Sequence, residues 1–158
     1  MVASETLRND PPTPQTRGKL RQDVVRRLLE RGRLQPHHVK AAEEIRTVHE
    51  AVGRGMFPTA QSMTWTGHQP DRGRGRDFLD RMTDAERHAW QHRYLPWTQE
   101  MATEIAAGIP GTRWLQLVVD VVVDNATLRE VERRYRLRLG AGLAYLERGL
   151  DRYDFRRH

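Results

Sequence analysis

The sequence predicts an all-α protein, and three observations favour this fold class. Apolar residues recur at spacings of three and four over several segments, which is the period of one helix face. Glycine and proline residues separate these segments, and no convincing pair of strands is present to form a sheet. Hydrophobic residues make up 37% of the 158 residues and charged residues 30%, so the chain can bury one modest core or two small helical units.

The charge balance indicates a polyanionic partner. The formal net charge is +6, and lysine occurs only at Lys19 and Lys40, so arginine supplies nearly all of the positive charge. A genome rich in G and C also favours arginine codons, but it does not account for the excess of positive over negative charge. Nucleic acid is the usual partner of such an excess.

Composition also narrows the cellular setting and the chemistry. The chain has no cysteine, which excludes disulfides, thiolate metal sites and cysteine nucleophiles. No apolar run approaches the ~20 residues that span a bilayer, and the N-terminus lacks the pattern of a secretory signal. We therefore expect a cytoplasmic protein that makes no membrane contact.

The N-terminal third is expected to hold an arm and a helical hairpin. Prolines at 11, 12 and 14 exclude helix, so residues 1–16 are predicted to be a disordered arm. Residues 17–53 are predicted to form the hairpin. Its first helix spans 18–32 with Gly32 as the stop, and its second helix starts at Pro36 and runs to about Val52.

Residues 54–76 are predicted to be a mobile loop or linker, because glycine and proline interrupt every periodic pattern there. Arg72, Arg74 and Arg76 alternate with glycine in this loop. Such a segment is typical either of a flexible phosphate contact or of a solvated linker. Trp65 lies in the same loop and could anchor it on the core or contact a partner.

Residues 77–158 are predicted to form a helical domain. Thr83 and Glu86 match a capping box, which starts a helix that runs to about Arg93. The sequence Leu-Pro-Trp at 95–97 is expected to interrupt it, and Thr98 is expected to cap a further short helix through Ala107. Residues 114–123 are apolar nearly all round, which predicts a buried helix, although their valines would also suit a strand.

The segment that follows has the layout of a helix-turn-helix, which we place at residues 114–153. Thr127 is a good N-cap for a short helix with Val131 on its apolar face. A tight turn is expected next, and then a longer helix with one apolar stripe. The stripe consists of Leu139, Leu143, Leu146, Leu150 and Tyr153.

The pattern Leu128-Arg-Glu-Val131-Glu132-Arg-Arg-Tyr135-Arg136-Leu137, followed by Leu146 and Leu150, resembles the C-terminal promoter-reading domain of bacterial sigma factors. It is also similar to helix-turn-helix units of small prophage-type DNA-binding proteins. The resemblance covers about a quarter of the chain. It departs from the family at Glu132, where a small residue is usual, and at Arg136, where glycine usually makes the turn. We expect Glu132 to lean outward or the helices to cross at a wider distance.

The resemblance implies a DNA-binding regulatory protein that uses the turn and the start of the last helix. Its partners would be double-stranded DNA, RNA polymerase, or further copies of the chain. The implied DNA-binding residues are Arg129, Arg133, Arg134, Arg136, Arg138, Gly140, Ala141, Ala144 and Arg148. Two alternatives remain open. One is a phage DNA-packaging component resembling a terminase small subunit, or another assembly component. The other is a protein-interaction bundle with a degenerate helix-turn-helix, whose arginines form pairs such as Glu130–Arg134 and Glu132–Arg136.

The sequence carries no convincing catalytic, metal or cofactor motif. His88 and His92 have the spacing of zinc-protease ligands, but Ala89 stands where those enzymes have glutamate. His37 and His38 are expected to be surface residues of a first turn. Asp120 and Asp124 are expected to pair with Arg113 or Arg129. We therefore expect a protein that is not an enzyme and that holds no metal or cofactor.

Overall fold

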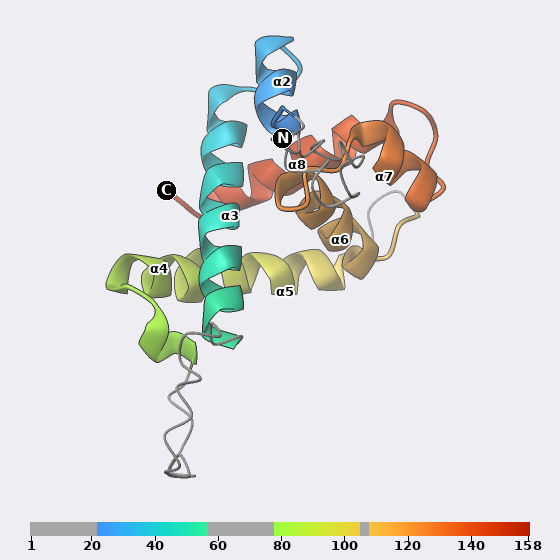
Figure 1. Cartoon of the computed structure of the whole chain (residues 1–158). Helices are drawn as coiled ribbons and strands as arrows, with labels where there is room; N and C mark the ends of the chain where they lie inside the picture. Colours follow the sequence, from blue (N-terminus) through green and yellow to red (C-terminus); the bar gives the residue numbers. More distant parts are fainter. Residues whose placement is uncertain (1–21, 57–77, 105–107) are drawn as a thin grey trace, which may run out of the picture.

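The computed structural model describes residues 22–56, 78–104 and 108–158, and these residues form helices joined by turns (Figure 1). No strand occurs in the described ranges, so the all-α prediction is confirmed. None of the described helices is long and apolar enough to cross a membrane. The predicted arm at 1–16 lies outside the described residues, as does most of the predicted loop at 54–76.

The first described helix is α2 (Val24–Glu30), which contacts α3 (Pro36–Met56). The chain leaves α2 through Gly32, whose φ of +66° lies in the left-handed region. The amide of Arg33 donates to the Leu28 carbonyl at 2.8 Å, which completes the turn typical of a glycine-terminated helix. The predicted stop at Gly32 is therefore confirmed.

Helix α3 is longer than predicted. It continues past Val52 and through Gly53 to Met56. A single glycine costs a helix interior only about 1 kcal/mol, so it does not end a helix that is packed on one side. The buried side of α3 includes Ile45 and Val48. Residues 54–56, which were predicted to belong to the loop, are therefore helical.

The predicted break at residues 95–97 is wrong. The helices α4 (Asp84–Ala89) and α5 (Leu95–Thr103) are joined by one π-helical turn, η3 (Trp90–Tyr94), into a continuous rod. Pro96 has no amide hydrogen and its ring crowds the preceding turn, and the wider π turn accommodates both effects.

The prediction that Thr98 caps a helix is wrong. It lies inside α5, where its hydroxyl donates to the Leu95 carbonyl at 2.8 Å. The capping box at the start of α4 is confirmed. Thr83 Oγ1 accepts the Glu86 amide at 3.2 Å, and the Glu86 carboxylate accepts the Thr83 amide at 3.0 Å. The short 3-10 turn η2 (Phe78–Arg81) precedes this cap.

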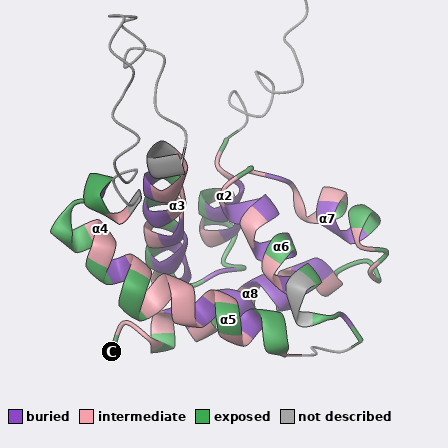
Figure 2. Cartoon of the chain, turned by 90° about the horizontal axis from the view of Figure 1, so that it is seen from below, coloured by how far each residue is buried: buried purple, intermediate pink, exposed green. Residues whose placement is uncertain are grey.

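The C-terminal part contains α6 (Gly111–Val122), α7 (Leu128–Arg134) and α8 (Ala141–Phe155). The apolar segment at 114–123 is thus helical, as preferred over a strand. One continuous core joins residues from α2 and α3 with residues from these helices, and Figure 2 shows the buried positions facing inward. The prediction fails at Leu139, which is 82% exposed instead of continuing the stripe of α8.

Two indole groups fix α8 against α5 and α6. Trp97 Nε1 donates to the Gly149 carbonyl at 2.9 Å, and Trp114 Nε1 donates to the Tyr145 carbonyl at 2.8 Å. Both tryptophans are completely buried. A Cβ atom at Gly149 would lie 2.6 Å from Cγ2 of Val118, so only glycine allows this close crossing.

Arg46 connects three helices at the other side of the core. Its guanidinium donates to Asp23 at 2.6 and 2.8 Å, and also to the carbonyl of Val122 at the end of α6. Asp23 is also the N-cap of α2 and accepts the Val25 amide at 2.9 Å. Burial by itself would raise the pKa of Asp23, but the hydrogen bonds and charge of Arg46 and the amides of α2 hold it below its usual value.

Replacing Gly149 by alanine should destabilise the protein by about 1 to 3 kcal/mol, because the added methyl group overpacks the contact with Val118. Urea unfolding at neutral pH measures this difference. Gly53→Ala is the matched control, since nothing lies within 4 Å of a Cβ at that helical position. It should raise stability by about 0.5 to 1 kcal/mol. Equal effects of the two substitutions would contradict the close crossing.

The Asp23–Arg46 pair predicts a specific acid sensitivity. The folded-state pKa of Asp23 is lowered, so its extra stabilisation is present above the unfolded pKa of about 3.9 and is lost as the pH falls through the folded value. Asp23→Asn should therefore be less stable than the wild type at pH 7, and the difference should shrink in acid. A difference that stays constant from pH 7 to below pH 3 would refute this role.

Candidate nucleic-acid interface

The α7–α8 region presents two short connections around a small helix. The α6–α7 turn ends at Thr127, whose Oγ1 accepts the Glu130 amide at 3.2 Å, while Glu130 accepts the Thr127 amide at 2.7 Å. The predicted N-cap is thus confirmed as a capping box. The connection between α7 and α8, residues 135–140, is called the α7–α8 turn below. It spans six residues and is longer than the predicted tight turn, because Leu139 extends into solvent instead of joining α8.

Arg136 stands where the resembling family has glycine, and it adopts the backbone conformation that glycine favours. Its φ is +54°, in the left-handed region, and the Leu137 amide donates to the Glu132 carbonyl at 2.8 Å. This geometry is that of a glycine-terminated helix with an arginine in the glycine position. Because α7 ends before Arg136, this residue is not on the helix face of Glu132, and the proposed helical pair Glu132–Arg136 does not form.

Of the two expectations for Glu132, an outward orientation or a wider helix crossing, the outward orientation is wrong. It is buried, with 6% of its surface exposed, and its Oε1 accepts the amides of Gly140 at 2.8 Å and Gly142 at 3.0 Å. A Cβ at Gly142 would lie 3.0 Å from Cγ of Glu132, so the glycine provides the room for this carboxylate. Glu132 therefore satisfies the free amides at the start of α8 and suits the positive end of the helix.

Asp120 is a second buried carboxylate that organises this region from within. It lies in α6 and accepts Arg134 Nη1 at 2.6 Å, the Tyr135 hydroxyl at 2.7 Å and Gln116 Nε2 at 2.9 Å. The predicted partners Arg113 and Arg129 were wrong, because Arg134 and Tyr135 at the end of α7 reach Asp120 instead. Burial, together with the hydrogen bond to Asp120, raises the pKa of Tyr135 to about 12.

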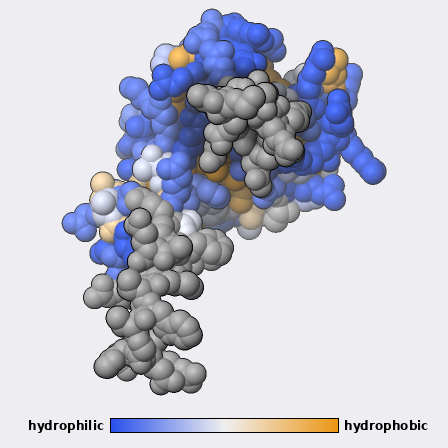
Figure 3. Space-filling view, in the orientation of Figure 1, coloured by the Kyte–Doolittle hydropathy of each residue, from blue (hydrophilic) through white to orange (hydrophobic). Residues whose placement is uncertain are grey.

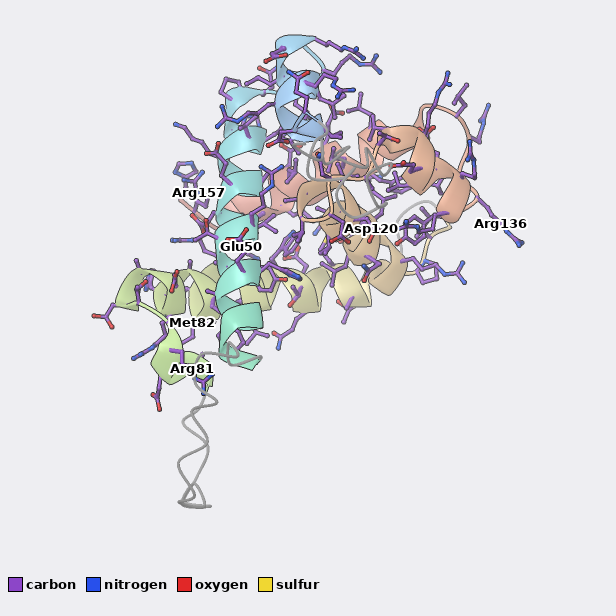
Figure 4. The ribbon with its side chains drawn as sticks, viewed as in Figure 1. Glu50, Arg81, Met82, Asp120, Arg136 and Arg157 are labelled. Carbon is purple, nitrogen blue, oxygen red and sulfur yellow. The ribbon has the colours of Figure 1, made fainter. Side chains whose placement is uncertain are left out.

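Four arginines remain exposed around the α7–α8 turn, and we call this set the basic face. Their side chains make no hydrogen bond or ion pair with the part of the chain that the structure describes. The basic face consists of Arg129, Arg133, Arg136 and Arg138. Figure 4 shows Arg136 pointing away from the molecule, whereas Asp120 lies between α6 and α7.

The basic face borders a shallow hollow. Arg129, Arg133 and Arg136 line it together with Glu132, Leu137 and Leu139. Figure 3 shows that the surface at this end of the molecule is mainly hydrophilic, with a small hydrophobic patch. Oε1 of Glu132 accepts two backbone amides, and no ion pair joins its carboxylate to the surrounding guanidinium groups among the described residues.

The remaining sequence-predicted residues occupy different positions. Ala144 and Arg148 are exposed on α8, and Ala141 is half-buried. Gly140 is exposed, but its amide is taken by Glu132. Arg134 is 56% exposed and is bound to Asp120, so it belongs to the internal network as well as to the surface.

Arginines at the other end of α8 are paired. Arg152 contacts Glu100 and Glu104 of the α5 region, and Arg156 also contacts Glu100. Arg152 lies over the Trp114 ring with its guanidinium carbon 5.6 Å from the ring centroid. The side chains of Arg156 and Arg152, which outweigh the burial of the carboxylate, lower the pKa of Glu100. The arginines at this end of α8 are therefore neutralised, in contrast to the four of the basic face.

The described residues hold one group of side chains of the metal-ligating type, His37, His38 and Asp151. His38 is buried, contrary to the prediction of a surface residue, and the Gln35 amide donates to its Nδ1 at 3.0 Å. The proton of neutral His38 therefore lies on Nε2, which donates to Asp151 at 2.7 Å. Nε2 is the nitrogen that would face a metal, so this hydrogen bonding favours a structural role.

No known protein family, no curated protein and no solved structure matches this chain. Its function is therefore inferred from its own residues.

The resemblance of residues 128–150 to a helix-turn-helix predicted the arginines of the basic face from the sequence. It did not predict that the carboxylates of Asp120 and Glu132 are buried and bound to other groups. The signal that could have indicated Glu132 is the Gly-Ala-Gly sequence at 140–142, which offers close, side-chain-free amides.

Arg136→Gly should stabilise the protein by about 1 kcal/mol, because glycine adopts a positive φ without the steric cost that an L side chain incurs. Gly140→Ala, at φ +86°, is the matched control in the same turn and should destabilise by a similar amount. Thermal or urea unfolding measures both. A destabilised Arg136→Gly variant would show that the arginine side chain makes a contact that outweighs its backbone conformation.

Proposed function

We propose that this protein is a DNA-binding regulatory protein whose basic face docks on the phosphate backbone of double-stranded DNA. The observation that carries this proposal is the exposure of four neighbouring arginines whose side chains have no hydrogen-bond or ion-pair partner among the described residues. Like charges on one surface repel each other, and a polyanion relieves this repulsion. Guanidinium groups also match phosphate oxygens with two parallel hydrogen bonds, which strengthens the contact.

The internal hydrogen bonds support the proposal, because they direct the two nearby carboxylates to other partners. Glu132 is bound to two amides at the start of α8, and Asp120 is bound to Arg134 and Tyr135. Among the described residues, neither carboxylate forms an ion pair with Arg133 or Arg138. A phosphate group could therefore bind these guanidinium groups without first breaking an ion pair.

The start of α8 suggests how DNA sequence would be read. Its exposed or half-buried side chains are small at Ala141 and Ala144, which permits a close approach to base edges but offers no hydrogen bond. Arg138 in the α7–α8 turn and Arg148 further along α8 are exposed residues that could contact guanine. Phosphate contacts would therefore supply most of the affinity, and base contacts a smaller share.

A salt series tests this function. Binding of a fluorescent random-sequence duplex should weaken linearly with the logarithm of salt concentration, and reversing both Arg133 and Arg138 to glutamate should lower the slope by about two. Lys40→Glu is the matched control, since Lys40 is exposed beside Asp154 and Arg157 at the opposite end of α8. It should leave the slope nearly unchanged.

The proposed function fails under two results. One is the absence of binding at low salt, despite the net charge of +6. The other is a loss of slope in Lys40→Glu of half that in the Arg133/Arg138 variant, because one charge reversal against two gives this ratio when net charge attracts DNA without a defined face.

A further inference from the structure

Leu139 is an exposed apolar side chain that does not contribute to the hydrophobic core. Of the described residues, the large hydrophobic side chains that are fully exposed are Leu139, at 82%, and Phe155, at 85%. Leu139 is the last side chain of the α7–α8 turn before Gly140, whose φ of +86° redirects the chain into α8. It therefore projects from the turn at the point where α8 begins.

The surroundings of Leu139 define the chemistry of a partner that would cover it. Leu139 lines the same hollow as Arg129, Arg133 and Arg136. A partner that buries the leucine must then also face these guanidinium groups. Glu132 is the acidic residue that lines the hollow, and its Oε1 is bound to two amides and not to the arginines. The partner must therefore supply negative charges for the arginines as well as an apolar group for Leu139.

Duplex DNA meets both requirements. Its major groove exposes the C5-methyl group of thymine between two rows of phosphates, and apolar side chains contact this methyl group. The small residues Ala141 and Ala144 follow Leu139 on α8 and leave it as the protruding apolar group of this surface. The phosphates would meet the basic face while the leucine points between them.

We propose that Leu139 contacts thymine methyl groups in the major groove and gives the protein a preference for thymine at the contacted position. This inference rests on the proposed function, because the basic face must first bring DNA to the turn. Burial of one methyl group corresponds to about a fourfold gain in affinity. The preference should therefore be modest but measurable.

The test compares two short duplexes of alternating A·T pairs that are identical except that one carries deoxyuridine in place of every thymidine. Deoxyuridine lacks the C5-methyl group and keeps the pairing and the phosphates. Fluorescence anisotropy at low salt should show the wild type binding the thymine duplex about fourfold more tightly. Leu139→Ala should bind both duplexes equally, with the affinity that the wild type has for the uracil duplex.

Phe155→Ala is the matched control, because it removes an equally exposed apolar side chain at the far end of α8. It should keep the thymine preference. Since Leu139 is exposed, Leu139→Ala should also keep the wild-type unfolding temperature. A wild type that binds both duplexes equally, or a Leu139→Ala variant that keeps the preference, would overturn the inference.

The outcomes separate this inference from the proposed function. If the Arg133 and Arg138 reversals weaken binding to both duplexes while Leu139→Ala keeps the preference, the basic face binds DNA and only the role of Leu139 is wrong. If the wild type binds neither duplex, both proposals fail, and an acidic protein surface becomes the partner that fits the leucine and the arginines.

Discussion

The close crossing of α8 over α5 and α6 is the contact on which the rest of the fold depends. It requires glycine at position 149, where any side chain would collide with Val118. It also lets Trp97 and Trp114 donate hydrogen bonds to carbonyls of α8 while both rings are buried. Two polar indole groups are thus satisfied inside the core, and the position of α8 along its axis is set. The α7–α8 turn leads directly into α8, so the position of this turn is fixed as well.

The distribution of charge follows from where the carboxylates are used. Asp23, Asp120 and Glu132 each cap a helix or hold an internal network, and they contact backbone amides or residues of neighbouring helices. The arginines near the α7–α8 turn outnumber the acidic groups left for them. Four guanidinium groups at that turn therefore stay without a carboxylate partner among the described residues, while Arg152 and Arg156 are neutralised against Glu100 and Glu104.

The sequence was sufficient for the features that depend on local patterns. Periodicity and capping residues predicted the helical class, the stop at Gly32 and the N-caps at Thr83 and Thr127, because each depends on a few adjacent residues. Features that depend on distant residues were missed. The break expected at Pro96 is absent because the burial of Trp97 favours a continuous rod with one π turn. Glu132 was expected to lean outward, since its partners lie eight and ten residues further along the chain.

The central claim is that the four arginines of the basic face, and not arginine in general, form the contact with DNA. Arginine side-chain Nε–H signals in nuclear magnetic resonance spectra, followed during titration with duplex DNA, test it directly. The account predicts changes at Arg129, Arg133, Arg136 and Arg138, with little change at the paired Arg46, Arg93 and Arg152. Changes spread evenly over all arginines, or confined to the paired ones, would contradict it.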